Sequence, residues 1–190
     1  MFTILHAGGK FGGGGYKVSG GLHGVGASVV NALSNWLEVE ICRDGKVYKQ
    51  RYERGKTMYP LKEIGTCDPD KTGTKVTFSP DGSIFETTTF DFNTLKVRLR
   101  ETAFLTKNLR ITLQDKREDP INERVFHYEG GIKEFVTYLN KGNQELYPEV
   151  IYCEGEKDGV YVEVAMQHND SYNDSSYSFV NNIITPEGGT

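Results

Sequence analysis

The sequence predicts an α+β fold, in which helices and antiparallel strands occupy separate stretches of chain and do not alternate as parallel units. Apolar residues recur at helical spacing in three stretches, residues 25–36, 92–103 and 132–139. Short stretches between them alternate apolar and polar residues, and a compact turn such as Asp44-Gly45 joins neighbouring strands directly. With 190 residues, the chain suits one large domain or parts of two.

The first predicted helix, residues 25–36, would turn one apolar face to a core. That face comprises Val25, Val29, Ala32, Leu33 and Trp36. Residues 37–42 then alternate as a half-buried strand, and the turn leads into a second strand over residues 47–52.

A third strand is predicted at residues 73–78. The intervening residues 54–71 show little periodicity and contain Gly, Pro and Asp, so they are predicted to be mainly loop.

The second half begins with the helix near residue 92, which Thr89 or Asp91 would cap. Strands are predicted at residues 109–114 and 125–128. Gly130-Gly131 then interrupts the pattern, which predicts a boundary between a domain at 1–129 and another at 130–190.

The second domain is predicted to contain one helix followed by strands. The helix carries Ile132, Phe135, Val136 and Leu139 on one face. The strands are expected at residues 150–154, 160–167 and 177–183.

Bulk composition bounds the class of protein. The chain is 37% hydrophobic and 25% charged, and it has neither an apolar run of about 20 residues nor a signal-peptide pattern, so we expect a cytoplasmic protein without a membrane partner. Its net charge of -4 argues against a protein that coats nucleic acid by itself. Cys42, Cys67 and Cys153 are odd in number and far apart in sequence, so we expect reduced cysteines and no structural zinc.

The most informative segment is rich in glycine. Ten of the 22 glycines fall within residues 8–26, and the segment ends in Ser19-Gly20-Gly21-Leu22-His23-Gly24-Val25-Gly26 before the first helix. Such a loop brings backbone N–H groups close to an anion, and the helix adds its positive dipole end. No acidic residue precedes Glu38, whereas Lys10 and Lys17 do. The segment therefore predicts a polyphosphate site.

A flexible glycine linker is the alternative interpretation of the same segment. Two familiar phosphate motifs are excluded, because Gly9-Lys10 lacks the P-loop frame and Gly21, Gly24 and Gly26 reverse the dinucleotide spacing.

Ordered motifs along the whole chain resemble the ATPase region of the DNA gyrase B family of type IIA topoisomerases, with the topoisomerase IV B subunits as the nearest alternative. The quoted stretches are Leu5-His6-Ala7-Gly8-Gly9-Lys10-Phe11, Gly15-Tyr16-Lys17-Val18, the Ser19 to Gly26 run, Val29-Val30-Asn31-Ala32-Leu33, Lys71-Thr72-Gly73-Thr74, Phe126-His127-Tyr128-Glu129-Gly130-Gly131, Val162-Glu163-Val164-Ala165 and Asn181-Asn182-Ile183.

The resemblance implies part of a GHKL-type (Bergerat) ATPase sandwich, including the ATP lid, followed by the start of a ribosomal-S5-like transducer domain. By similarity, Lys10 and Tyr16 lie in the lid and donate to phosphate oxygens. The residues implied to present backbone amides to the triphosphate are Gly20, Gly21, Leu22, His23, Gly24, Val25 and Gly26.

Two further residues are implied to lie near the adenine. Arg43 resembles the arginine at the edge of the adenine pocket, where aminocoumarins bind in the family. Thr74 resembles a threonine that shares in adenine recognition through water. Without the resemblance, an exposed arginine and a β-branched strand residue would be the simpler interpretations.

The chain also departs from the family pattern. The glutamate base, the asparagine that holds Mg2+ and the Asp-x-Gly-x-Gly segment have no counterpart here, and a lysine that reaches the γ-phosphate would follow Thr190. We therefore expect an internal fragment with no catalytic residue or metal ligand of its own, weak ATP binding and no measurable ATP hydrolysis in isolation.

The resemblance implies a role for the longer protein. ATP and Mg2+ would be its cofactors, and gyrase A, a second copy of gyrase B and double-stranded DNA its partners. ATP binding would close the lid, promote dimerisation and drive strand passage with negative supercoiling. A noncatalytic nucleotide-binding module and a glycine-rich interaction domain remain alternatives.

Overall fold

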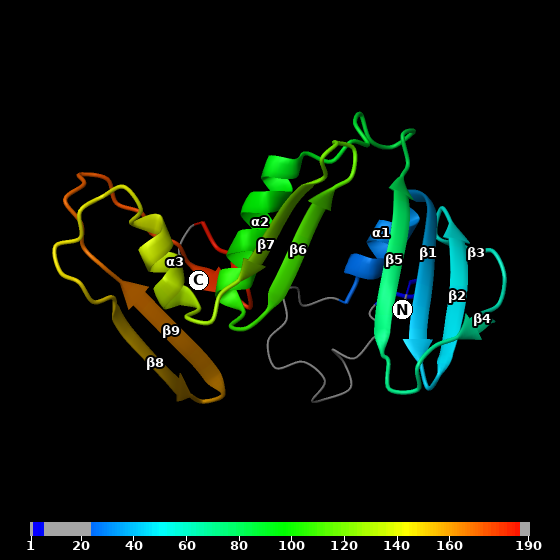
Figure 1. The fold of residues 1–190 in the computed structure, drawn as a ribbon, viewed down its shortest axis with the longest axis horizontal. Helices are drawn as coiled ribbons and strands as arrows, with labels where there is room; N and C mark the ends of the chain where they lie inside the picture. Colours follow the sequence, from blue (N-terminus) through cyan, green and yellow to red (C-terminus); the bar gives the residue numbers. More distant parts are fainter. Residues whose placement is uncertain (1, 6–23, 187–190) are drawn as a thin grey trace. The chain divides into compact units, whose positions relative to one another are not determined.

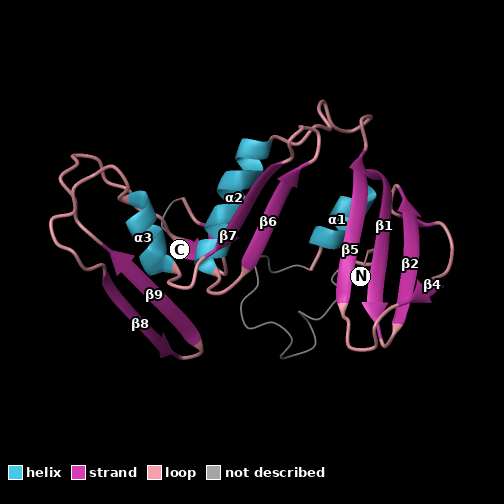
Figure 2. Cartoon of the chain, in the orientation of Figure 1, coloured by secondary structure: helices cyan, strands magenta, loops and turns pink. Residues whose placement is uncertain are grey.

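The structure is a computed structural model that describes residues 2–5 and 24–186. Two compact units divide the chain, Met1–Thr89 and Phe90–Thr190. Figure 2 shows helices and antiparallel strands in separate segments, which confirms the α+β prediction. No helix in the described ranges is long and apolar enough to span a membrane.

The first unit is built around an antiparallel sheet in the order β3-β2-β1-β5, with β4 also paired to β2 (Figure 1). Its strands are β1 (Ser34–Arg43), β2 (Lys46–Glu53), β3 (Lys56–Thr57), β4 (Lys62–Thr66) and β5 (Gly73–Pro80). The β1–β2 turn has positive φ at Asp44 (52°) and Gly45 (74°), the geometry of a tight hairpin that matches strand twist.

The predicted strands at residues 37–42, 47–52 and 73–78 are therefore confirmed. The prediction that residues 54–71 form mainly loop was partly wrong, because they contain β3 and β4. These strands are two and five residues long, and their side chains are exposed, so they leave almost no hydrophobic pattern to detect.

The helix predicted over residues 25–36 was too long. Helix α1 spans Gly26–Ala32, and Trp36 instead lies in β1. Its predicted apolar face was also wrong, because Val29 is 43% exposed while Ser28 and Asn31 are buried. Asn31 donates to the Phe2 carbonyl at 2.9 Å, so this helix is held partly by polar contacts, which apolar periodicity does not reveal.

The core of the first unit lies on one face of the sheet. Leu37, Val39 and Tyr52 are buried there, with Phe2 and Ile41 packed against them. Tyr52 lies opposite Leu37 in the β1–β2 ladder, so β1 and β2 supply this cluster from adjacent positions.

The second unit opens with helix α2 (Phe92–Leu105). Its N-cap is Asp91, whose side chain accepts from the Thr94 amide at 2.7 Å, which confirms one of the two predicted caps. The helix packs on a hairpin of β6 (Arg110–Asp115) and β7 (Asn122–His127). Phe104 of α2 is buried and stacks on Tyr128, with ring centroids 3.6 Å apart.

Helix α3 (Ile132–Leu139) and the hairpin of β8 (Ile151–Lys157) and β9 (Val160–Met166) complete the larger elements of the second unit. Phe135 of α3 stacks on Phe104, so α2 and α3 share an aromatic core. The strand predicted over residues 177–183 was wrong as a single element. Instead, β10 (Phe179–Val180) and β11 (Ile183–Ile184) pair across Asn181 and Asn182, both with positive φ. The predicted domain boundary at Gly130 stays a prediction.

Candidate functional site

The structure describes only part of the predicted nucleotide site. Six of its residues lie outside the described ranges: Lys10, Tyr16, Gly20, Gly21, Leu22 and His23. The described members are Gly24, Val25, Gly26, Arg43 and Thr74, all in the first unit.

The described end of the glycine segment leads directly into α1. Gly24 has φ +58°, a left-handed conformation that favours glycine. Val25 is the N-cap of α1, and no side chain of the described ranges caps the helix there. A Cβ added to Gly26 would meet no described atom within 4 Å. The role of this segment in binding phosphate stays a prediction.

Arg43 and Thr74 are brought to one face of the sheet by strand register. Thr74 of β5 is the direct partner of Ile41, and Arg43 lies two residues further along β1, on the same face as Ile41. Diagonal neighbours of this kind are about 7–8 Å apart between their Cα atoms. Two residues that are 31 positions apart in sequence thus lie at the same end of the sheet.

Apolar side chains continue this face toward the core. Val76 of β5 is the direct partner of Val39 and remains 44% exposed, although Val39 itself is buried. The Arg43 side chain is 75% exposed, and its Nε lies 3.4 Å from Asp44 Oδ2. This surface therefore combines an exposed cation, a hydroxyl and exposed apolar area. Strand alternation alone puts Val76 on the face of Thr74, and sequence reasoning missed Val76 because no motif in the sequence marks it as a site residue.

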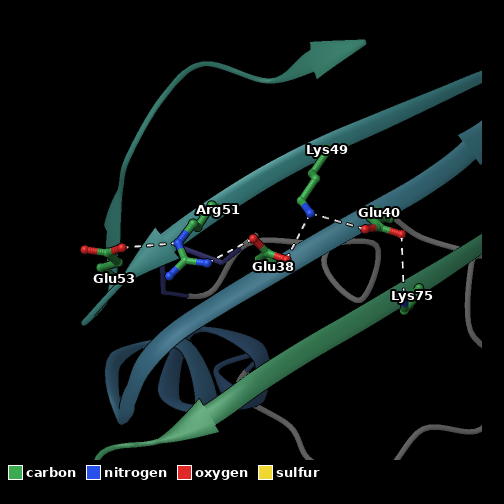
Figure 3. Close-up of polar contacts among 6 residues, drawn as sticks. All are labelled: Glu38, Glu40, Lys49, Arg51, Glu53 and Lys75. Carbon is green, nitrogen blue, oxygen red and sulfur yellow. Dashed lines mark hydrogen bonds and ion pairs between the residues drawn. The ribbon is translucent and has the colours of Figure 1, made fainter. Parts of the chain in front are cut away.

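The opposite face of the same sheet is covered by ion pairs (Figure 3). Glu38 accepts from Lys49 and Arg51, each at 3.0 Å, and these two cations lower the pKa of its carboxyl group. Glu40 lies between Lys49 and Lys75, at 3.4 and 3.7 Å. Because these charges neutralise one another, this face has little unpaired positive charge to attract an anionic nucleotide. Arg43 lies on the other face of the sheet, with Thr74.

A second polar cluster links elements of the second unit. Lys107 Nζ lies 2.7 Å from Glu163 Oε1, and Tyr152 donates to the same oxygen at 2.6 Å. Tyr161 donates to Glu154 at 2.6 Å. The carboxylates raise the pKa of both tyrosines, so the hydroxyls remain protonated donors. This cluster satisfies its own donors and acceptors, which is typical of a structural contact.

No group of three or more His, Cys, Asp or Glu residues in the described ranges could hold a metal ion. The predicted roles of Gly24, Val25, Gly26, Arg43 and Thr74 in nucleotide binding stay predictions.

Comparisons with known proteins identify the relatives of this chain. Residues 131–190 match the DNA gyrase B family. Over 100% of its length, the chain is 61% identical to the DNA topoisomerase 4 B subunit of Streptococcus pneumoniae and covers 29% of that protein. It is 60% identical to the DNA gyrase B subunit of Halalkalibacterium halodurans, again over 100% of its length, and covers 30% of that protein.

The chain is also similar to solved structures of gyrase B. The 43K ATPase domain of Thermus thermophilus gyrase B, in complex with an aminocoumarin, matches 85% of this chain and 43% of its own, with a TM-score of 0.77 and 40% identity. The gyrase B subunit of Myxococcus xanthus matches with a TM-score of 0.77 at 27% identity, over 86% of this chain and 47% of its own.

The fold and these similarities define a class: the chain has the GHKL-type ATPase architecture of type IIA topoisomerase B subunits. Within that class, residues 131–190 match the DNA gyrase B family, and the whole chain is similar to the B subunits of both topoisomerase IV (61% identity) and DNA gyrase (60%). It spans less than a third of the length of these two relatives.

Proposed function

We propose that this chain forms part of the ATP site of a type II DNA topoisomerase of the gyrase kind, within the protein that carries the ATPase. In that protein, ATP binding and hydrolysis would drive DNA strand passage and negative supercoiling. The observation that carries the proposal is the 40% identity and TM-score of 0.77 to a gyrase B ATPase domain, with the two expected adenine-side residues on one sheet face.

The triphosphate would lie at the glycine segment that leads into α1. The left-handed Gly24 and the open position of Gly26 support close approach of phosphate oxygens to backbone amides. Lys10 and Tyr16 would donate to the same oxygens from the lid. Mg2+ would neutralise phosphate charge, and the chain's own residues would bind and orient the nucleotide.

The adenine would lie against the face that carries Thr74 and Val76. The threonine hydroxyl would hold a bridging water, and the valine would supply apolar contact. Arg43 would border this pocket, where its exposed guanidinium can move to meet a ligand. An aminocoumarin, which the Thermus relative holds, would reach the same edge.

The complete assembly is proposed to contain gyrase A, a second copy of gyrase B and double-stranded DNA, in the cytoplasm. A topoisomerase IV protein is the second candidate, favoured by the 61% identity to the Streptococcus pneumoniae relative. Because the identity to a gyrase relative is 60%, sequence similarity does not separate the two activities. Supercoiling by the complete complex, against relaxation alone, would distinguish them.

Fluorescence titration with a mant-labelled, nonhydrolysable ATP analogue tests the site itself. We expect Arg43→Ala and Thr74→Val each to weaken binding by about tenfold, equivalent to about 1.4 kcal/mol. Lys75→Ala is the matched control, because its side chain is 71% exposed on the same strand and contacts Glu40 on the opposite face. Equal affinities for all four proteins would contradict the proposed pocket.

A further inference from the structure

The β8–β9 hairpin meets helices α2 and α3 through a polar face. Side chains alternate along paired strands, so one face of the hairpin carries Tyr152, Glu154, Tyr161 and Glu163. Lys107, just beyond the end of α2, places its Nζ atom 2.7 Å from Glu163 Oε1 and donates to the Tyr152 hydroxyl at 3.3 Å. From α3, the Lys133 ammonium lies 4.3 Å from the centre of the Tyr152 ring. Two cations therefore connect the hairpin to the two helices.

Most apolar side chains of the same hairpin lie on its other face. Val160, Val162, Val164 and Met166 alternate along β9 and are 39–61% exposed, and Ile151 of β8 lies opposite Met166. These five side chains cannot contribute to the attachment of the hairpin to the helices. Dissolved salt screens an ammonium–carboxylate contact that is partly exposed, so this attachment should weaken as the ionic strength rises.

The open end of the hairpin has a second attachment, which is made by neutral groups. Asn140, the C-cap residue of α3, is 6% exposed. Its Nδ2 atom donates to Gln167 Oε1 at 2.8 Å, and its Oδ1 atom accepts from Asn169 Nδ2 at 2.7 Å. Because these amides carry no net charge, salt should weaken this second attachment little.

We propose that the Lys107 contacts form a salt-sensitive joint, through which the β8–β9 hairpin exchanges between a docked and an undocked position. In the docked position, the ammonium of Lys107 binds Glu163 while its aliphatic stem crosses Gly131, where an added Cβ would lie 2.7 Å from the Lys107 Cε atom. In the undocked position, water and dissolved cations solvate Glu163, and the hairpin turns about its attachment at Asn140.

The joint leaves the rest of the second unit in place. Phe104 and Phe135 stack between α2 and α3 without the hairpin, so undocking does not separate the helices. The Lys107 and Glu163 side chains are 43% and 22% exposed, and loss of one such ion pair changes an equilibrium by up to about fivefold. All residues of the joint lie in the second unit, so the proposal does not depend on the nucleotide site proposed for the first.

The distance between two spin labels, measured by double electron–electron resonance, tests the joint. One label is attached to Cys153, which is exposed and lies on the face of β8 away from Glu163. The other is attached through Val97→Cys in α2, where the native side chain is 48% exposed. Cys42→Ser and Cys67→Ser remove the other thiols. We expect a narrow distance peak in about 50 mM salt and a peak about twice as broad in about 1 M salt.

Substitutions of Lys107 separate its charge from its packing. Lys107→Met keeps a stem over Gly131 but removes the charge, so its peak should be broad at low salt and change little with added salt. Lys107→Arg should restore the narrow peak, because a guanidinium can bind the same carboxylate. Lys141→Met is the matched control, because it removes the same charge from a lysine that lies over Tyr138 of α3.

The salt series needs no substitution at the joint, so it tests the proposal even where a Lys107 variant fails to fold. A peak width that salt leaves unchanged would overturn the proposal. So would a folded Lys107→Met chain with the narrow peak, or equal broadening by Lys141→Met.

Discussion

Replacement of Leu37 by alanine should destabilise the first unit by about 3 kcal/mol. The Leu37 side chain is 0% exposed and lies in the cluster with Val39 and Tyr52. Truncation removes three carbon atoms, which at about 0.8 kcal/mol each gives roughly 2.4 kcal/mol. The cavity that remains in a partly rigid core adds to this loss and brings the total to about 3 kcal/mol.

Urea unfolding followed by tryptophan fluorescence measures this loss selectively. Trp36 is the single tryptophan of the chain and adjoins Leu37 in β1, so its signal reports the first unit. Ile64→Ala in β4 is the control, because Ile64 is 53% exposed and its truncation should cost under about 0.5 kcal/mol. A Leu37→Ala loss below about 1 kcal/mol, with an unchanged urea slope, would refute the assignment of this core.

The remaining predictions concern the second unit. Asp115 has its pKa lowered to about 2, chiefly by hydrogen bonds from Arg117, so its contribution to stability is present above its unfolded pKa near 4 and is lost as pH falls through about 2. Asp115→Asn should make the fall in stability between pH 5 and 2 shallower in circular-dichroism unfolding, and an unchanged slope would contradict this. Gly131 has φ +59°, and an added Cβ would lie 2.7 Å from the Lys107 Cε atom. Gly131→Ala should therefore lower the free energy of unfolding, measured by hydrogen exchange in α3, by about 2 kcal/mol. Gly155→Ala should lower it less, because no atom lies within 4 Å of its added Cβ. Glu163→Gln breaks the ion pair with Lys107, so it should lower the free energy of opening of β8 and β9, measured by hydrogen exchange, by up to about 1 kcal/mol. Glu156→Gln is the control and should not change this free energy, because Glu156 is exposed.

Strands and turns with a strong local signal could be predicted from the sequence. The Asp44-Gly45 turn and the alternation on either side located β1 and β2, because a tight hairpin depends on a few adjacent residues. The cap at Asp91 was equally local. Features set by distant partners could not be predicted in this way: α1 buries Asn31 against the Phe2 carbonyl, a contact across 29 residues.

The candidate site, too, could be predicted from the sequence only in part. The residue types and spacing of the glycine segment pointed to an anion, and family resemblance pointed to Arg43 and Thr74. Their position on one face depends on the pairing of Ile41 with Thr74, which only the sheet register shows. The same register adds Val76 to that face and places the ion pairs of Glu38 on the other.

An NMR titration of the chain, labelled with nitrogen-15, tests most directly whether its glycine segment and sheet face bind a nucleotide. The 21.3 kDa chain would be titrated with a nonhydrolysable ATP analogue and Mg2+ into the millimolar range, with adenosine and tripolyphosphate as separate controls. We predict saturable shifts at the amides of residues 20–26 and Thr74, with tripolyphosphate moving the first group and adenosine the second. Shifts confined to other residues, or none at saturating concentration, would contradict the account.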